Sequence, residues 1–162
     1  MVKLTQSTKS AKQNEIIRNW HLIDVKGKIL GRSISDSIEY LQGKHKVNYS
    51  QYLDSGDFVV IINAKDIKVS GNKSLTKLYT NYSGYPGGLK TINFADLLKK
   101  NPDRLLRHAI SGMLPKNKLR DRRLARLFIF ADEKHPYKNK FEALNPKSET
   151  NSNGKNSKSK TK

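Results

Sequence analysis

The residues of this chain best suited to chemistry are cations crowded into residues 112–126. Six of these fifteen residues are Lys or Arg, and only Asp121 is an acid. Leucines recur among them, so we expect the segment to be anchored to a folded body while it presents positive charge. Such a surface suits a polyanion, and RNA is the commonest polyanion in a cell. The candidate contacts are Lys116, Asn117, Lys118, Arg120, Arg122, Arg123 and Arg126.

A second basic group follows a predicted helix that ends at Gly43. Cations at this end of a helix also favour its macrodipole, so charge complementarity explains the group as well as RNA contact does. Tyr49 and Tyr52 lie just beyond and favour RNA. The candidate contacts of this group are Lys44, His45 and Lys46.

Residues 79–88 interleave three tyrosines with three glycines. Aromatic rings stack on bases, glycines let two backbones approach, and neighbouring lysines pair with phosphates. The alternative is an ordinary loop whose tyrosines pack on the core, and the scarcity of acids nearby favours binding. We predict a loop over residues 73–91. Its candidate RNA contacts are Lys73, Lys77, Tyr82, Tyr85 and Lys90.

We predict no catalytic residues, resident metal, cofactor or small-molecule substrate. The four histidines include no pair at the spacing of a helical metal site, and the chain has no cysteine. Asp54 and Asp57 are better explained as turn formers than as acid–base catalysts. The loop at residues 27–33 has the wrong glycine spacing for a nucleotide-binding P-loop. Three further candidates for phosphate contact are Arg32, His135 and Lys138.

The overall charge points to the same class of partner. The 162 residues include 32 Lys plus Arg against 14 Asp plus Glu, a formal charge of +18. This excess opposes compaction unless a partner neutralises it. An anionic membrane is the alternative to nucleic acid, but no apolar run approaches the roughly 20 residues of a spanning helix. The N-terminal residues do not resemble a secretory signal, and the lack of cysteine suits a reducing cytosol.

These candidate residues must be positioned by a folded body, which we place at residues 19–144. Residues 1–18 are predicted to be a flexible basic arm. The tail at 145–162 is predicted to be disordered because it contains almost nothing apolar. In the body, residues 20–25 are expected to form a strand. Leu30, Ile34, Ile38 and Leu41 share one helical face, and the β-branched run 58–62 predicts a strand buried on both faces.

The second half of the body alternates in the same way. An extended segment is expected around Ile67 and Val69. Asn93 is expected to cap a helix with Asp96 at the third position, and Pro102 to begin another. A short basic helix at 117–124 and a strand at 127–131 follow. The pattern predicts an α/β fold with a mainly parallel sheet of about four strands and helices on both faces.

Seven motifs occur in a fixed order along the chain: Trp20 with Asp24, Gly31-Arg32, residues 43–46, residues 56–64, residues 70–73, residues 83–88 and residues 112–117. Together they resemble one known family, the large-subunit ribosomal protein thirteen family of bacterial or organellar type. The resemblance covers about residues 19–138. It implies a three-layer α/β/α fold and a structural protein, not an enzyme, that binds large-subunit ribosomal RNA early in assembly.

The resemblance also implies partners and a location. These are large-subunit ribosomal RNA, neighbouring large-subunit proteins and a cytoplasmic ribosome, with an organellar ribosome left open. The chain departs from the family pattern at Tyr137, where a histidine is usual, and at residues 120–123, where a glycine often precedes the basic pair. Two alternatives stay open: an enzyme that binds a nucleotide at residues 27–33, and a DNA-binding module.

Overall fold

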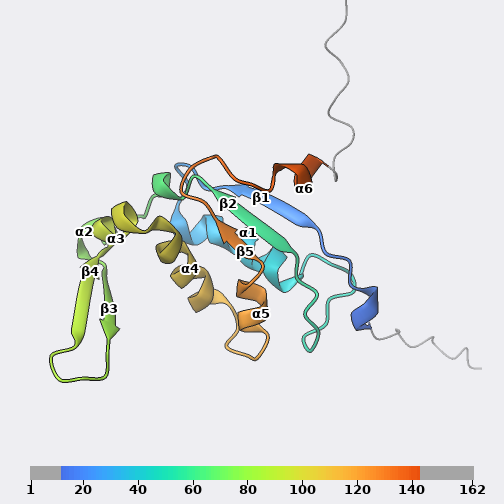
Figure 1. Cartoon of the computed structure of the whole chain (residues 1–162), viewed down its shortest axis with the longest axis horizontal. Coiled ribbons are helices and arrows are strands. Elements are labelled where there is room, and N and C mark those ends of the chain that lie inside the picture. Colours follow the sequence, from blue (N-terminus) through green and yellow to red (C-terminus); the bar gives the residue numbers. More distant parts are fainter. Residues whose placement is uncertain (1–11, 143–162) are drawn as a thin grey trace, which may run out of the picture.

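A three-stranded parallel sheet forms the centre of the molecule. The computed structural model describes residues 12–142. Strands β1 (Trp20–Asp24), β2 (Phe58–Ile62) and β5 (Leu127–Ile129) lie in the order β1-β2-β5 (Figure 1). The register pairs Trp20 with Phe58 and Val59 with Leu127. The middle strand is the continuous β-branched run, as expected for a strand covered on both faces.

Helices α1 (Leu30–Gln42) and α4 (Pro102–Met113) each contribute three buried residues to the core on one face of the sheet. The predicted apolar stripe of α1 faces inward, with Ile34 and Leu41 fully buried. Pro102 stands at the first turn of α4, where its missing N–H costs nothing. Helix α3 (Phe94–Lys100) begins after Asn93, as predicted, although the Asn93 side chain makes no capping hydrogen bond.

The opposite face of the sheet is covered by the segment that leads into α6 (Lys138–Glu142). The Trp20 ring stacks on Phe58 at 4.5 Å, on Phe128 at 5.7 Å and on Tyr137 at 5.1 Å between centroids. Alternation along a strand puts these residues opposite Val59 and Leu127, which face the helical core. The α/β class with a mainly parallel sheet is therefore confirmed. The aromatic side of the sheet has only a thin cover.

Replacing Tyr137 by Ala is expected to lower the free energy of unfolding by about 2 kcal/mol, because it uncovers the stacked ring of Trp20. Urea denaturation followed by Trp20 fluorescence measures the change. Tyr85, which is 75% exposed, provides the matched Tyr→Ala control and should change stability by less than about 0.5 kcal/mol. Equal losses in both variants would contradict the covering role of Tyr137.

The predicted loop at residues 73–91 is wrong. The segment forms a short helix α2 (Lys73–Thr76) and an antiparallel hairpin of β3 (Leu78–Tyr82) and β4 (Leu89–Asn93). Gly84 and Gly87 adopt positive φ in the turn between the strands, which glycine allows without strain. The hairpin projects as an arm from the body (Figure 1).

The remaining boundaries differ from the predictions in detail. The main sheet has three strands, because the segment at Ile67 and Val69 contributes only a parallel bridge between Ile29 and Lys68. Short 3-10 helices η1 (Gln13–Glu15) and η2 (Ala64–Asp66) occur, and the basic helix α5 (Arg120–Leu124) starts later than predicted. The predicted tail at 145–162 lies outside the described residues. Within residues 12–142, no helix is long and apolar enough to cross a membrane.

Candidate nucleic-acid interface

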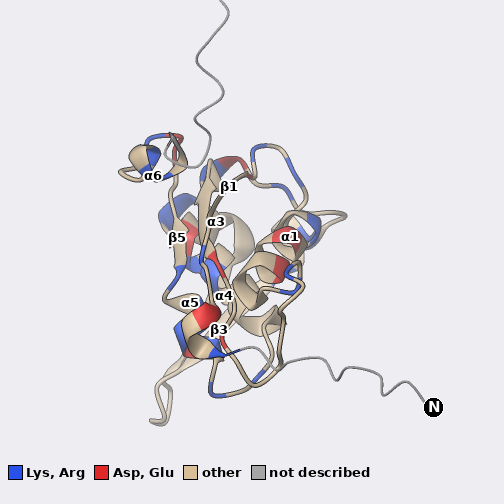
Figure 2. Cartoon of the chain, turned by 90° about the vertical axis from the view of Figure 1, so that its right-hand side faces the viewer, with Lys and Arg blue, Asp and Glu red and all other residues tan. Residues whose placement is uncertain are grey.

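The basic segment 112–126 is fixed to the core at both ends. It leaves α4 through Leu114, which is 2% exposed, and enters β5 at Leu127, which is also 2% exposed. Between them, α5 packs against α1 and α4. Figure 2 shows Lys and Arg residues gathered on α5 and on the connections near it. The positive charge is therefore held on a fixed support.

The structure divides the six cations of this segment into two groups. Lys116, Lys118 and Arg122 are exposed, as is Asn117 between the lysines. The other three point inward. Arg123 is 1% exposed, Arg126 is 8% exposed, and the half-buried Arg120 donates a hydrogen bond to the Ser111 hydroxyl.

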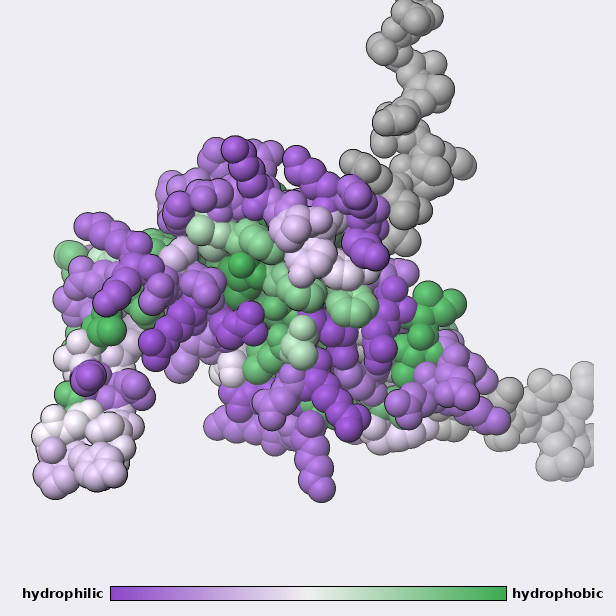
Figure 3. Space-filling model, viewed as in Figure 1, coloured by the Kyte–Doolittle hydropathy of each residue, from purple (hydrophilic) through white to green (hydrophobic). Residues whose placement is uncertain are grey.

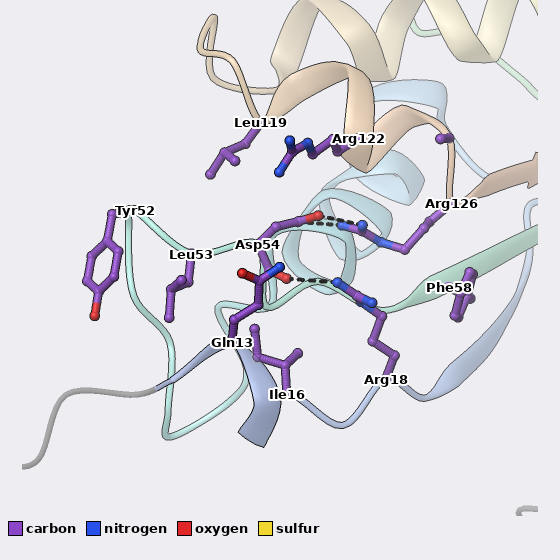
Figure 4. Close-up of a pocket in the computed structure, with 11 residues that line it drawn as sticks. Gln13, Ile16, Arg18, Tyr52, Leu53, Asp54, Phe58, Leu119, Arg122 and Arg126 are labelled. Carbon is purple, nitrogen blue, oxygen red and sulfur yellow. Dashed lines mark hydrogen bonds and ion pairs between the residues drawn. The ribbon is translucent and has the colours of Figure 1, made fainter.

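Asp54 neutralises two of the inward arginines, Arg126 and Arg123. Arg126 donates two hydrogen bonds of 2.5 Å to the two carboxylate oxygens of Asp54, a bidentate pair (Figure 4). The Nε atom of Arg123 lies 3.8 Å from the same carboxylate. Asp54 is therefore an anchor for α5, and its predicted role as a turn former is wrong. Arg123 and Arg126 direct their charge into the protein, so we assign them to holding α5 in place.

Asp57 is a second internal anchor, and it is completely buried. Lys46 forms an ion pair with one carboxylate oxygen, and the Nε2 atoms of His21 and His45 lie 2.9 and 3.0 Å from the other. The main-chain amide of Asn19 also donates to Asp57 at 3.0 Å. Asp57 lies in extended chain just before β2, so the predicted turn role is wrong here too.

Two glycines allow this approach. Gly43 ends α1 in the left-handed region with φ 78°. A Cβ atom on Gly56 would lie 1.8 Å from the carbonyl oxygen of Leu41, so only glycine lets the two segments meet. The basic group after α1 is thereby brought against Asp57. Lys44 and His45 are both exposed and Lys46 is half-buried, and of the three it is His45 and Lys46 that contact Asp57.

The ligand atoms of His21, His45 and Asp57 lie within 4.8 Å of one another, a donor set that a metal ion accepts. The Lys46 ammonium already pairs with the same carboxylate and would repel a cation placed there. His21 also stacks on Tyr40 at 4.0 Å between ring centroids. We therefore interpret the cluster as an ion-pair network.

This network makes stability depend on pH. Burial raises the pKa of Asp57, but hydrogen bonds from His21, Lys46 and the Asn19 amide outweigh it and lower the pKa to about 2. A lowered folded-state pKa stabilises the protein above the unfolded value of 3.8, and the stabilisation is lost as the pH falls toward 2. We expect a loss on the order of 2 kcal/mol across this window by urea denaturation. An unchanged midpoint between pH 5 and pH 2 would contradict the assignment.

The hairpin arm and α4 enclose a basic groove that the sequence did not reveal. Arg104 and Arg107 lie three residues apart on the polar side of α4, and both line the groove together with Lys90. Arg107 also donates to the carbonyls of Leu124 and Leu127, which ties α4 to the end of the basic segment. A search for i, i+3 cations opposite the apolar stripe would have found the pair.

The other candidates are spread over the surface. Lys73, Lys77 and Lys90 are exposed, and Lys77 lies 5.4 Å from the ring centroid of Tyr79. Tyr82 and Tyr85 are 62% and 75% exposed on the arm. The tip of the arm is paler than the strongly hydrophilic body in Figure 3, so it carries less charge.

The last three candidates lie at separate places. Arg32 is exposed in the first turn of α1, and Lys138 is exposed at the start of α6. His135 is half-buried, with ring contacts to Phe130 at 6.1 Å and Phe141 at 5.7 Å between centroids. It therefore packs against the aromatic face of the sheet.

The fold and the outward cations define a class, a small α/β protein that holds a basic surface on a rigid support. A sequence comparison narrows the class: the profile of the ribosomal protein L13 family matches residues 18–136. The chain belongs to the ribosomal protein L13 family.

Individual relatives match this chain over most of their own length. The large ribosomal subunit protein uL13 of Syntrophotalea carbinolica is 45% identical over 131 residues, covering 81% of this chain and 92% of the relative. That of Petrotoga mobilis is 46% identical over 145 residues, covering 90% and 93%. That of Clostridioides difficile is 46% identical over 127 residues, covering 78% and 89%.

Proposed function

We propose that this chain is a structural constituent of the large ribosomal subunit that binds large-subunit ribosomal RNA and supports early subunit assembly and translation. It acts as a structural component and not as an enzyme. Its partners are large-subunit ribosomal RNA and neighbouring large-subunit proteins, with no membrane and no small-molecule substrate. Its location is the cytoplasmic ribosome, or an organellar one in a host that has it.

The observation that carries the proposal is the division of the cations. The internal acids Asp54 and Asp57 each hold basic side chains inside the fold, and this fixes the loops that present the outward ones. Lys116, Lys118 and Arg122 are left facing solvent on a rigid segment. Preordered cations neutralise phosphates at a lower entropic cost than mobile ones.

We propose a wider RNA-facing set around this segment. RNA in A form hides its base edges in a deep groove, so recognition rests mostly on phosphates, shape and unpaired bases. Besides Asn117 and the three outward cations, the set comprises Arg32, Lys44, Lys73, Lys77, Tyr82, Tyr85, Lys90 and Lys138, with Arg104 and Arg107 added from the groove.

The nucleotide-enzyme alternative has no support in the geometry. Gly31 lies inside α1, so residues 27–33 do not form a loop that wraps a phosphate chain. The two cations of this segment, Lys28 and Arg32, are exposed. No observation favours a second candidate function.

Sucrose-gradient sedimentation of cell lysate tests the proposal. The tagged chain is expected to migrate with large subunits and to stay with them at high salt, because assembled ribosomal proteins are enclosed by folded RNA. An unrelated tagged protein of similar charge serves as the control and should dissociate as salt rises. Recovery of this chain only in RNA-free fractions would refute the proposed function.

A further inference from the structure

A pocket of about 540 Å³ lies where three distant segments meet: residues 13–18, residues 52–54 and the region of α5. In Figure 4, Leu119 and Arg122 border it on one side, Gln13, Ile16 and Arg18 on the other, and Tyr52 stands at an end. This volume is in the range of sites for small organic molecules. Residues 1–18 are predicted from sequence to be a flexible arm, so the pocket is visible only in the structure.

The pocket has a positive excess. Three guanidinium groups line it, from Arg18, Arg122 and Arg126, against one carboxylate, that of Asp54. Arg126 uses both oxygens of that carboxylate, and Arg18 donates to the main-chain carbonyl of Asp54 at 3.4 Å. The exposed Arg122 guanidinium extends over the pocket from α5 (Figure 4). An occupant should therefore carry negative charge near Arg18 and Arg122.

The rest of the lining is apolar. Ile16, Leu53, Phe58 and Leu119 supply aliphatic and aromatic surface, and the Tyr52 ring is 64% exposed. A bare phosphate gains nothing from such a wall, whereas the flat face of a nucleobase does. Bases that proteins bind are commonly stacked on aromatic rings or guanidinium planes. Together, the charge and the wall fit a nucleoside monophosphate unit.

We propose that this pocket binds one unpaired nucleotide of the RNA, with its base against the apolar wall and its phosphate between Arg18 and Arg122. The inference rests on the proposed function and adds a single-strand site to the phosphate-binding surface. A paired base cannot enter, because its face is stacked and its edge is bonded to the other strand. The pocket therefore makes this part of the interface sensitive to RNA single-strandedness.

A pair of charge-matched variants of the full chain tests the inference. Arg122→Gln removes one of the cations that line the pocket, and Lys118→Gln removes an exposed cation four residues earlier that does not line the pocket. The probes are a ten-nucleotide single-stranded RNA and a duplex RNA of the same length. Arg122→Gln should weaken single-strand binding about tenfold more than Lys118→Gln does. Both variants should weaken duplex binding equally. Equal losses on the single strand would overturn the inference.

The apolar wall is tested separately. Leu119→Ala should weaken binding of the single-stranded RNA by about fivefold and leave binding of an abasic oligomer of the same length unchanged. Leu75→Ala, at a position 76% exposed on α2, is the control and should change neither. Equal weakening of both oligomers by Leu119→Ala would contradict a base-binding wall.

Titration with free 5′-AMP tests whether the pocket binds a nucleotide within RNA or a free nucleotide. The NMR chemical shifts of the Leu53 and Ala125 backbone amides should change when single-stranded RNA is added at micromolar concentration. With 5′-AMP, these shifts should not saturate below millimolar concentration. Micromolar saturation by 5′-AMP would overturn the assignment to RNA and identify a free-nucleotide site. If these tests fail while the chain still sediments with large subunits, the pocket inference alone is wrong.

Discussion

Replacing Asp57 by Asn is expected to lower the free energy of unfolding by about 3 kcal/mol or more. The carboxylate is completely buried and balances Lys46, whose side chain is 18% exposed, together with His21 and His45. An amide cannot balance that charge, and removal of one partner of a buried pair leaves the other charge uncompensated. Urea denaturation at pH 7 measures the loss. The variant should also lose the acid dependence of stability described above.

The control for this experiment is an acid in a surface pair. Asp132 lies 2.9 Å from Lys65, with both side chains more than half exposed, so Asp132→Asn should cost less than about 1 kcal/mol. Adding Lys46→Met to Asp57→Asn should recover part of the stability, because it removes the uncompensated charge. If the two single Asn variants are equally stable, Asp57 is not the anchor of the loop after α1.

The elements that the sequence predicted well are those fixed by local signals. The apolar stripe of α1, the glycine that ends it and the proline that begins α4 act within a few residues of where they stand. The β-branched run of β2 is likewise a local signal, and it predicts a buried strand. The hairpin arm was missed because its turn is glycine-rich and most of its strand residues are exposed, so neither strand shows an alternating pattern of burial.

The anchors were missed for a different reason. Asp54 and Arg126 are 72 residues apart in the chain, and Asp57 and His21 are 36 apart. A short acidic turn and a buried ion-pair anchor contain the same residue types, and only tertiary contacts separate them. The sequence therefore predicted the wrong role for both acids.

The direction of each cation also depended on tertiary structure. Arg122 and Arg123 are neighbours, yet the first is exposed and the second is 1% exposed. Successive residues of a helix point about 100° apart, so an unbroken basic run must split between two faces. Arg123 and Arg126 are three apart and turn together toward Asp54. The helical period showed that a split must occur, but only the position of Asp54 decides which face is inside.

This split determines the experiment with the largest expected effect on RNA binding. Replacing Lys116, Lys118 and Arg122 together by Ala should weaken binding to large-subunit ribosomal RNA by on the order of a hundredfold at physiological salt. All three are exposed, so the variant should keep its stability. Filter binding across a salt series should show the slope of log K against log salt shrinking by about 0.7 to 0.9 per lost phosphate contact.

A charge-matched triple variant separates position from net charge. Lys26, Lys28 and Lys68 are exposed beside the turn between β1 and α1, so their replacement by Ala removes the same charge from another part of the surface. It should weaken binding much less, because only unspecific attraction is reduced. Arg123 is left unchanged in both variants, because its removal disturbs the contact with Asp54. A loss of RNA affinity could then result from lower stability and not from a lost phosphate contact. Equal losses of affinity and slope in the two triples would mean that net charge alone drives binding and that segment 112–126 is not a positioned RNA contact.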